Sequence, residues 1–217
     1  MPSQVVLITG GGRGIGAAIA RGVAREGRVP VVVYHTRHHD AEALVGEIRR
    51  DGGHAVAVCA DVGREDDILR CFEVADREGQ LAGLVNNAGI SQRSPAVDTD
   101  LSVYQRIVDV DLLAPIALTQ ALLSHMVSRG AGQIVMISSV AGKAGIPMRT
   151  AYCAAKHGLI GYADALRSEV AGQGVKVLVV APGSVKTNVS RNALNADGSV
   201  RSVRFSWPVV SSRQSTQ

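Results

Sequence analysis

The chain has 217 residues, of which 46% are hydrophobic and 19% are charged, and its formal net charge is +4. This length suits one domain with a sizeable core, and the composition is that of a globular protein rather than a disordered one. The positive charge comes mainly from arginines spread along the chain, not from a basic patch with interleaved aromatic residues, so we expect no nucleic-acid binding.

Short apolar runs rich in β-branched residues alternate along the chain with helix-patterned segments. Because these runs are continuously apolar, we expect strands that are buried on both faces. Alternation of strand and helix predicts a parallel sheet with right-handed crossovers, which is a doubly wound α/β fold in a single domain. The expected strands are 4–9, 30–34, 54–59, 81–86, 133–138 and 175–181, and the expected helices are 15–26, 40–50, 64–78, 101–129 and 152–172.

A glycine-rich motif, ITGGGRGIG, follows the first expected strand and opens the first expected helix. Glycines let the backbone turn tightly and approach a pyrophosphate, and the helix N-terminus supplies free N–H groups. A glycine turn without a ligand is the alternative, but strand and helix both stand where a phosphate site requires them. The candidate cofactor-binding residues here are Thr9, Gly10, Gly12, Arg13, Gly14, Ile15 and Gly16.

The T-G-x-x-x-G-x-G spacing resembles the short-chain dehydrogenase/reductase family, in particular its NADP-preferring 3-oxoacyl and carbonyl reductases. The resemblance continues in the family's order through CADV, NNAG, ISSVAG, the Tyr-x-x-x-Lys pair and APGSVKT, and it covers residues 5 to about 190. It implies a Rossmann fold. It also implies further cofactor contacts from Asp61, Val62, Asn87, Ala88, Gly89, Tyr152, Lys156, Pro182, Gly183, Val185 and Thr187.

By the same resemblance, Tyr152 is the catalytic acid–base, Lys156 is its electrostatic partner, and Ser139 orients the substrate. A tyrosine hydroxyl has an ordinary pKa of about 10, and a nearby ammonium favours the phenolate, so the pairing is chemically sensible. Tyr152 and Lys156 are four residues apart and share a helix face, so they could also be mere helix neighbours. The ordered motifs around them favour the catalytic interpretation.

Asp111 departs from the family pattern, which usually has an asparagine at this place in the long fourth helix. In the family this residue supports a kink whose backbone carbonyl holds a water of the proton relay. If the carbonyl does this work, we expect catalysis to survive in weakened or altered form, whereas a need for the amide would break the relay. A carboxylate without a catalytic role is the alternative.

The end of the second expected strand indicates which nicotinamide cofactor binds. An NAD site needs an acid there for the ribose 2′-hydroxyl, but the run reads Tyr34, His35, Thr36 and Arg37, with no acid before Asp40. Arg13 and Arg37 suit a 2′-phosphate, which arginine holds bidentately. We therefore predict NADP(H), with His35, Thr36 and Arg37 at its phosphate. A metal site at His35, His38 and His39 is disfavoured because their spacing lacks support from other ligands.

The expected substrate segments are 90–98, 140–150 and whatever follows Gly183. Arg93, Lys143 and Arg149 make this mouth basic, which would suit an acidic substrate or an acyl carrier protein, although solvated charge is the commoner explanation. The expected substrate is a small-molecule carbonyl compound or an acyl thioester. Rival hypotheses are an NADP(H)-binding protein that does not catalyse, and an NAD-linked dehydrogenase working toward oxidation.

The last part of the chain lacks the family's usual further helices and last strand. We expect a catalytic domain over 1–190 and an atypical, irregular tail over 191–217. A homodimer through 101–129 and 152–172 is expected. The uncharged segment 112–128 contains Pro, Gln, Ser and His, which favours a buried helix over a membrane span. Three cysteines without CxxC spacing, and no signal-peptide pattern, indicate a cytoplasmic protein.

Overall fold

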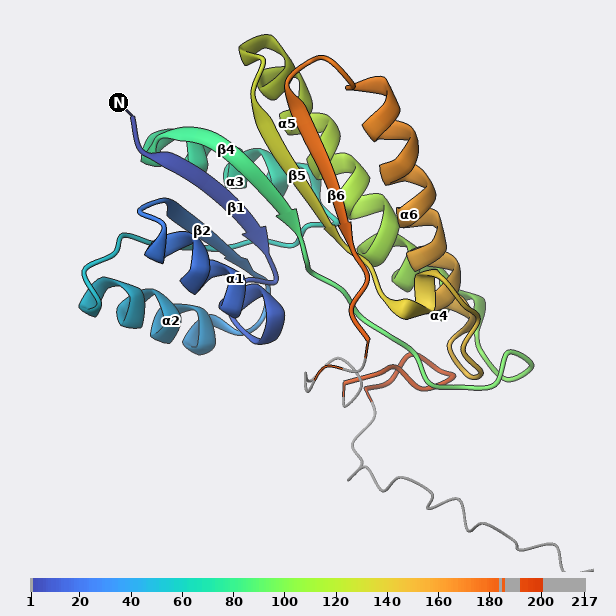
Figure 1. Ribbon diagram of the computed structural model, residues 1–217. Coiled ribbons are helices and arrows are strands. Elements are labelled where there is room, and N and C mark those ends of the chain that lie inside the picture. The colour runs from blue at the N-terminus through green and yellow to red at the C-terminus, as the bar shows by residue number, and fades with distance from the viewer. Residues whose placement is uncertain (1, 184, 186–191, 201–217) are drawn as a thin grey trace, which may run out of the picture.

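The computed structural model describes residues 2–183, 185 and 192–200, and its elements follow the predicted order (Figure 1). The strands begin and end within two residues of their predicted positions. They are β1 (Gln4–Thr9), β2 (Val29–Tyr34), β3 (Val56–Cys59), β4 (Gln80–Asn86), β5 (Gly132–Ile137) and β6 (Val175–Val180). The helices are α1 (Gly14–Arg25), α2 (His38–Arg50), α3 (Glu65–Glu78), α4 (Leu101–Val108), α5 (Ala114–Arg129) and α6 (Thr150–Glu169).

The predicted helix 101–129 is not continuous, because a π-helical turn, η1 (Asp109–Leu113), separates α4 from α5. A π turn inserts an extra residue into the i→i−4 ladder and is a recognised cause of helix kinks. Asp111 lies in this turn and is fully buried. The structure therefore places a distortion where the resemblance implied a kink.

All six strands pair in parallel in one sheet, in the order β3-β2-β1-β4-β5-β6. This order reverses between β1 and β4, so the chain crosses to the opposite side of the sheet after β3. The doubly wound prediction is confirmed. Such a reversal leaves a crevice at the carboxyl ends of the central strands, where ligands bind in sheets of this kind.

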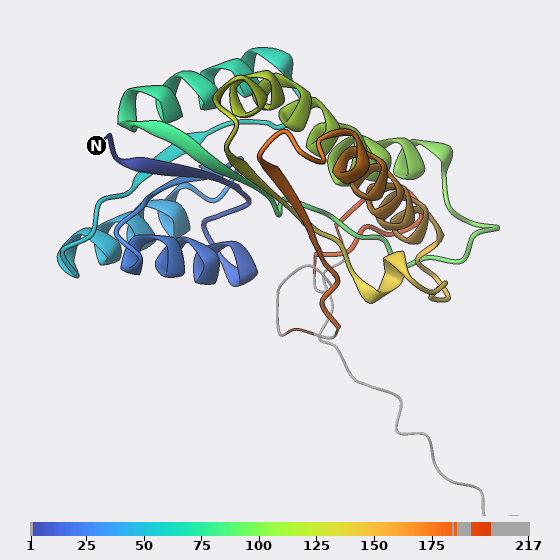
Figure 2. The same ribbon diagram turned by 45° about the horizontal axis from the view of Figure 1, so that its top comes forward.

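Helices cover both faces of the sheet (Figure 2). α1 and α2 pack on one face around Ile8, Val32 and Leu44, whereas α3, α5 and α6 pack on the other around Leu7, Leu84 and Leu159. Burial on both faces explains why β1 and β2 are continuously apolar.

The segment 101–129 is long and apolar enough to cross a membrane by composition, with a mean hydropathy of 1.6 in its most apolar window. Its α5 part packs on the sheet, and Leu118, Leu122 and Met126 are buried there. A core helix of a soluble protein has the same composition. The segment is therefore weak evidence for a membrane span.

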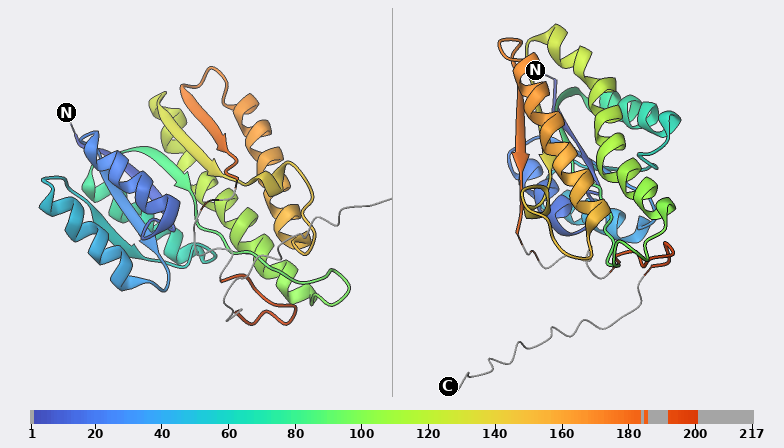
Figure 3. Two further views of the ribbon diagram at one scale, coloured as in Figure 1. Left: turned by 60° about the horizontal axis from the view of Figure 1, so that its bottom comes forward. Right: turned by 90° about the vertical axis from the view of Figure 1, so that its right-hand side faces the viewer.

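Residues 192–200 return to the body of the domain beside the loop that follows β4 (Figure 3). Leu194 is only 2% exposed, accepts a hydrogen bond from the Arg93 amide, and packs with Val103 and Ile107 of α4. This part of the predicted tail is irregular and contributes to the core. No seventh strand occurs within the described residues, and the division at residue 190 stays a prediction.

Candidate active site

A cleft of about 2000 Å³ opens at the carboxyl ends of the strands. Every part of the sequence that was predicted to bind cofactor or substrate contributes to its wall. The predicted residues that line it are Gly10, Gly12, Arg13, Gly14, Ile15, His35, Thr36, Arg37, Asp61, Val62, Asn87, Ala88, Gly89, Asp111, Ser139, Tyr152, Lys156, Pro182, Gly183 and Val185. Thr9 and Gly16 do not line it, and Thr187 lies outside the described residues.

The glycine loop forms the floor of the cleft between β1 and α1. Gly10 and Gly14 have φ of 61° and 56°, a conformation that residues with a Cβ rarely adopt. A Cβ on Gly16 would lie 2.4 Å from the Gly10 carbonyl oxygen. Gly16 therefore allows the close packing of α1 against the loop, and it does not line the cleft. The loop leaves the first amides of α1 at the cleft, as a pyrophosphate requires.

Thr9 fixes the glycine loop to the end of β4. Its Oγ1 accepts hydrogen bonds from the amides of Asn87 (2.9 Å) and Ala88 (3.0 Å). The Asn87 side chain also binds the glycine loop, because its Nδ2 donates to the carbonyls of Thr9 (2.9 Å) and Gly10 (3.1 Å). Thr9 is therefore a positioning residue of the cleft, and Asn87 holds the loop as well as lining the cleft.

The end of the cleft beyond β2 is basic. Arg13 and Arg37 immediately precede α1 and α2 and line the cleft together with His35. Asp40, the first acid after β2, lies within α2 and does not line the cleft. Asp61 does line it, with its Oδ2 3.9 Å from the His35 ring. The residues that the end of β2 contributes to the cleft therefore include no acid.

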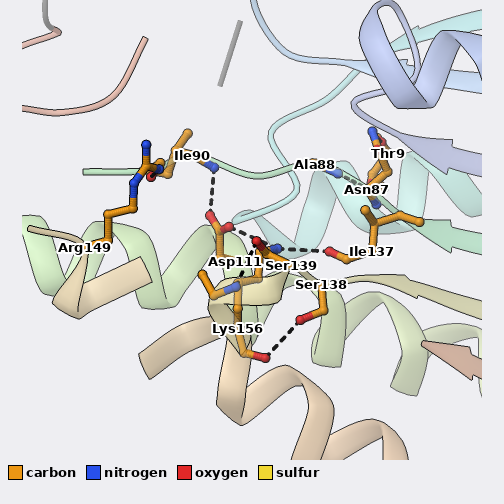
Figure 4. Close-up of polar contacts among 12 residues, drawn as sticks. Thr9, Asn87, Ala88, Ile90, Asp111, Ile137, Ser138, Ser139, Arg149 and Lys156 are labelled. Atoms are coloured by element: carbon orange, nitrogen blue, oxygen red, sulfur yellow. Dashed lines mark hydrogen bonds and ion pairs between the residues drawn. The ribbon is translucent and has the colours of Figure 1, made fainter. Parts of the chain in front are cut away.

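Lys156 is the centre of the polar contacts in Figure 4. Its Nζ donates to the Ile137 carbonyl (3.1 Å) and lies 5.7 Å from the centre of the Tyr152 ring. The side chain is only 4% exposed. The lysine thus presents an ammonium to the tyrosine within the fold, and the helical spacing of the pair brings both to the cleft.

The Asp111 carboxylate lies across Lys156 Nζ from the Ile137 carbonyl, with Oδ2 3.1 Å from Nζ (Figure 4). Its Oδ1 accepts a hydrogen bond from the Ile90 amide (2.8 Å), which ties the π turn to the loop after β4. Burial raises the pKa of Asp111, and the Lys156 charge and the Ile90 amide oppose that rise. The sequence indicated the residue but not its ion pair with the lysine.

Ser139 and Ser138 follow β5 and make different contacts. The Ser139 hydroxyl accepts a hydrogen bond from the Ala141 amide (3.2 Å) at the start of the short 3₁₀-helix η2 (Val140–Gly142) and lines the cleft. The Ser138 hydroxyl is buried and donates to the backbone carbonyl of Lys156 (3.1 Å). Both residues line the cleft, but the Ser138 hydroxyl is engaged with α6, whereas the Ser139 hydroxyl can still donate to a ligand.

Two residues inside the expected substrate segments 90–98 and 140–150 have roles that the sequence did not indicate. Gln92 is fully buried, where its Oε1 accepts from the Tyr152 amide (3.2 Å) and its Nε2 donates to the Thr150 hydroxyl (3.1 Å). It therefore fixes the start of α6. Met148 lines the cleft with a φ of 64°, which is uncommon for a residue with a side chain. No sequence pattern identifies either role.

The substrate end is also basic, because Arg93 and Arg149 both line the cleft, whereas Lys143, the third cation expected there, does not line it. Arg149 is half-buried and donates to the Ser91 hydroxyl (2.8 Å). Burial lowers the pKa of Arg149, and the neighbouring Arg93 charge lowers it further. Two cations at one wall favour a ligand with an anionic group at that place. Within the described ranges no group of three or more His, Cys, Asp or Glu side chains could hold a metal.

The chain matches the family model of the short chain dehydrogenases over residues 4–198. It is 37% identical to a 3-oxoacyl-[acyl-carrier-protein] reductase of Synechocystis sp. over 91% of this chain and 80% of that protein. It is 38% identical to dehydrogenase/reductase SDR family member 7B of Bos taurus over 91% of this chain, which spans only 62% of that protein.

Two solved structures have the same fold with NADP bound. One is a putative NAD(P)-dependent gluconate 5-dehydrogenase of Beutenbergia cavernae, with a TM-score of 0.80, 36% identity, and coverage of 86% of this chain and 74% of that chain. The other is a metagenomic short-chain oxidoreductase, with a TM-score of 0.79, 34% identity, and coverage of 85% and 84%. In the first of these two structures the NADP is bound at low occupancy.

Proposed function

The chain belongs to the short-chain dehydrogenase family, and from that membership we propose that it reduces a ketone with NADPH, using Tyr152 as proton donor. The observation that carries the proposal is that Tyr152, Lys156 and Ser139 line the same cleft as the glycine loop. A cofactor on that loop and a carbonyl at the tyrosine would then share one cavity.

The residues present fit a nicotinamide dinucleotide with a 2′-phosphate. Gly10 and Gly14 supply a loop with no Cβ in the way of a pyrophosphate, next to the first amides of α1. Arg13 and Arg37 would hold the 2′-phosphate, because no acid precedes Asp40 to bind a free ribose hydroxyl. NADP(H) is therefore the proposed cofactor, in line with the two solved relatives.

When bound, the reduced nicotinamide supplies a hydride to the carbonyl carbon. The Tyr152 hydroxyl donates its proton to the carbonyl oxygen, so the product is the alcohol and the tyrosine is left as phenolate. The Lys156 ammonium stabilises that phenolate, and the Ser139 hydroxyl donates a hydrogen bond to the developing oxyanion. In the reverse direction the Tyr152 phenolate accepts the proton of the alcohol.

The proposed substrate is a small carbonyl compound or a 3-oxoacyl thioester. The Synechocystis relative is named as a reductase of such a thioester. Arg93 and Arg149 at the substrate end support a ligand that carries an anionic group. We further propose a cytoplasmic homodimer that buries parts of 101–129 and 152–172, where Leu101 and Leu113 are exposed.

The proposal is tested by measuring NADPH oxidation with purified protein and a panel of ketones, diketones, quinones and 3-oxoacyl thioesters. Turnover should be lost by about 10²- to 10⁴-fold in Tyr152→Phe, which lacks the proton but keeps the ring. If NADPH binds but no compound turns over, the protein is instead an NADP(H)-binding member that does not catalyse. Turnover that survives in Tyr152→Phe would refute the assigned role of the tyrosine.

A further inference from the structure

Gln92 is a fully buried polar side chain whose amide oxygen and amide nitrogen are both hydrogen-bonded. Its Oε1 accepts from the Tyr152 amide (3.2 Å), and its Nε2 donates to the Thr150 hydroxyl (3.1 Å). The orientation of the side chain follows from chemistry, because a backbone N–H can only donate and must therefore meet the oxygen. Buried polar groups with all their partners in place make the surrounding structure rigid.

The bond from Tyr152 to Gln92 serves as a cap at the start of α6. The first amides of a helix have no carbonyl partner within that helix, and Tyr152 is the third residue of α6. Arg149, which precedes the helix, makes no side-chain hydrogen bond to these amides. Gln92 supplies the acceptor from the loop after β4, 60 residues away in the chain. The backbone position of Tyr152 therefore depends on a residue outside its own helix.

Thr150 connects this contact to a second helix. Its hydroxyl lies 2.7 Å from the Tyr104 hydroxyl of α4, so Tyr104, Thr150 and Gln92 form one chain of hydrogen bonds that ends at the Tyr152 amide. None of these three side chains lines the cleft. Any effect that they have on catalysis must therefore act through the position of Tyr152, not through contact with the substrate.

We propose that Gln92 is a positioning residue for the reaction: it holds the first turn of α6 so that the Tyr152 hydroxyl meets the carbonyl oxygen of the substrate. The inference rests on the proposed reductase function. Proton transfer needs the donor within hydrogen-bond reach of the acceptor, and a displacement of about 1 Å can lower a rate about a hundredfold. The same position serves both directions of the reaction, so reduction and oxidation should slow alike.

The test compares two substitutions of Gln92. Gln92→Met keeps the length of the side chain and removes both hydrogen bonds, whereas Gln92→Glu keeps an oxygen that can accept from the Tyr152 amide. Gln92→Met should lower kcat by about ten- to hundredfold and leave the Kd of NADPH unchanged. Gln92→Glu should recover most of the lost kcat. An unchanged kcat in Gln92→Met, or an equally low kcat in Gln92→Glu, would overturn the inference.

Thr119→Val is the matched control for a loss of stability alone. Thr119 is also fully buried, and its hydroxyl bonds to Asn86 (3.2 Å) and to the Pro115 carbonyl (2.7 Å), neither of which belongs to the chain that ends at Tyr152. Both Thr119→Val and Gln92→Met should unfold at lower urea concentration than wild type, but only Gln92→Met should lower the kcat of the folded protein. An equal fall of kcat in the control would contradict a positioning role.

A second measurement does not depend on turnover. The protein is made with fluorotyrosine, and the fluorine resonance of Tyr152, one of four tyrosines, is assigned by its loss from Tyr152→Phe. That resonance should move or broaden in Gln92→Met and stay in place in Thr119→Val. If Gln92→Met does not fold, Thr150→Val takes its place, because it removes only the acceptor of Gln92 Nε2 and should produce a smaller change in the same direction.

The two measurements separate the inference from the proposed function. A Tyr152 resonance that is unaffected by the loss of the Gln92 contacts would refute the positioning role, whether or not the protein reduces any compound. A wild-type protein that reduces nothing, but whose resonance moves as expected in Gln92→Met, would overturn only the proposed function.

Discussion

The Lys156 ammonium and the Asp111 carboxylate form an ion pair 3.1 Å apart inside the fold. Removing one member of a buried pair leaves the other charge without compensation. We therefore expect Lys156→Met to lower the free energy of unfolding by about 3–5 kcal/mol at neutral pH, measured by urea denaturation. Lys176→Met, which changes an exposed lysine of β6, should alter the free energy of unfolding by less than about 0.5 kcal/mol.

The cost of Lys156→Met should depend on pH. Burial raises the pKa of Asp111, and the lysine is the first influence that opposes the rise. Without the lysine the carboxylate takes up a proton at higher pH, and protonation removes the buried charge. The difference in stability from wild type should therefore be full at neutral pH and shrink as the pH falls through the folded-state pKa toward the ordinary value of 3.8. A difference that grows on acidification would contradict the ion pair.

Gly16 and Gly22 lie in the same helix but differ in what surrounds them. A Cβ at Gly16 would lie 2.4 Å from the Gly10 oxygen and 2.7 Å from Asn87 Nδ2, whereas a Cβ at Gly22 meets nothing within 4 Å. Gly16→Ala should therefore distort the loop and weaken NADPH binding at least tenfold in a fluorescence titration. Gly22→Ala should keep that affinity and raise the free energy of unfolding by about 0.5–1 kcal/mol, because alanine is the better helix residue. Equal effects of the two substitutions would show that the loop is not the sensitive element.

The sequence was sufficient to predict the fold and the outline of the cleft. The glycine loop, the strand ends and the Tyr152–Lys156 pair are set by local spacing, and a parallel sheet brings the carboxyl ends of its strands to one edge. The six strands of the structure pair in one parallel sheet, as that reasoning requires. The strand predicted at 54–59 begins only at Val56, where its pairing with Val31 of β2 begins.

The contacts within the site could not be predicted from spacing, because they join segments that are distant in the chain. The ion pair of Asp111 with Lys156 depends on the π turn, which turns a residue of the 101–129 segment toward α6. The role of Gln92 could not be predicted from the sequence, because it depends on a hydrogen bond from the backbone amide of Tyr152, 60 residues away in the chain. The burial of Leu194 was missed for the same reason, as it depends on the loop after β4.

Ser139 and Ser138 are adjacent, but we expect alanine at Ser139 to lower kcat and alanine at Ser138 to lower stability. Ser139 lines the cleft, so Ser139→Ala should remove a donor to the developing oxyanion and lower kcat by about 10²- to 10³-fold. Ser138 bonds to the Lys156 carbonyl, so Ser138→Ala should lower the free energy of unfolding by about 1 kcal/mol. Steady-state kinetics and thermal denaturation on both variants separate the two roles. A larger loss of kcat in Ser138→Ala than in Ser139→Ala would contradict the roles assigned to the two serines.

Arg13 and Arg37 should decide between NADPH and NADH. Both residues line the cleft where no acid precedes Asp40, so they are the groups available to a 2′-phosphate. A charge-assisted hydrogen bond contributes about 1.5–3 kcal/mol, which corresponds to about ten- to hundredfold in affinity for each arginine. Changing both to alanine should weaken NADPH by at least about a hundredfold and NADH by only a few-fold, as measured by calorimetry. Arg25→Ala, in the last turn of α1, is the control for net charge and should leave both affinities unchanged. Equal losses for the two cofactors would mean that the arginines hold the shared pyrophosphate instead, and the preference for NADP(H) would then need another source.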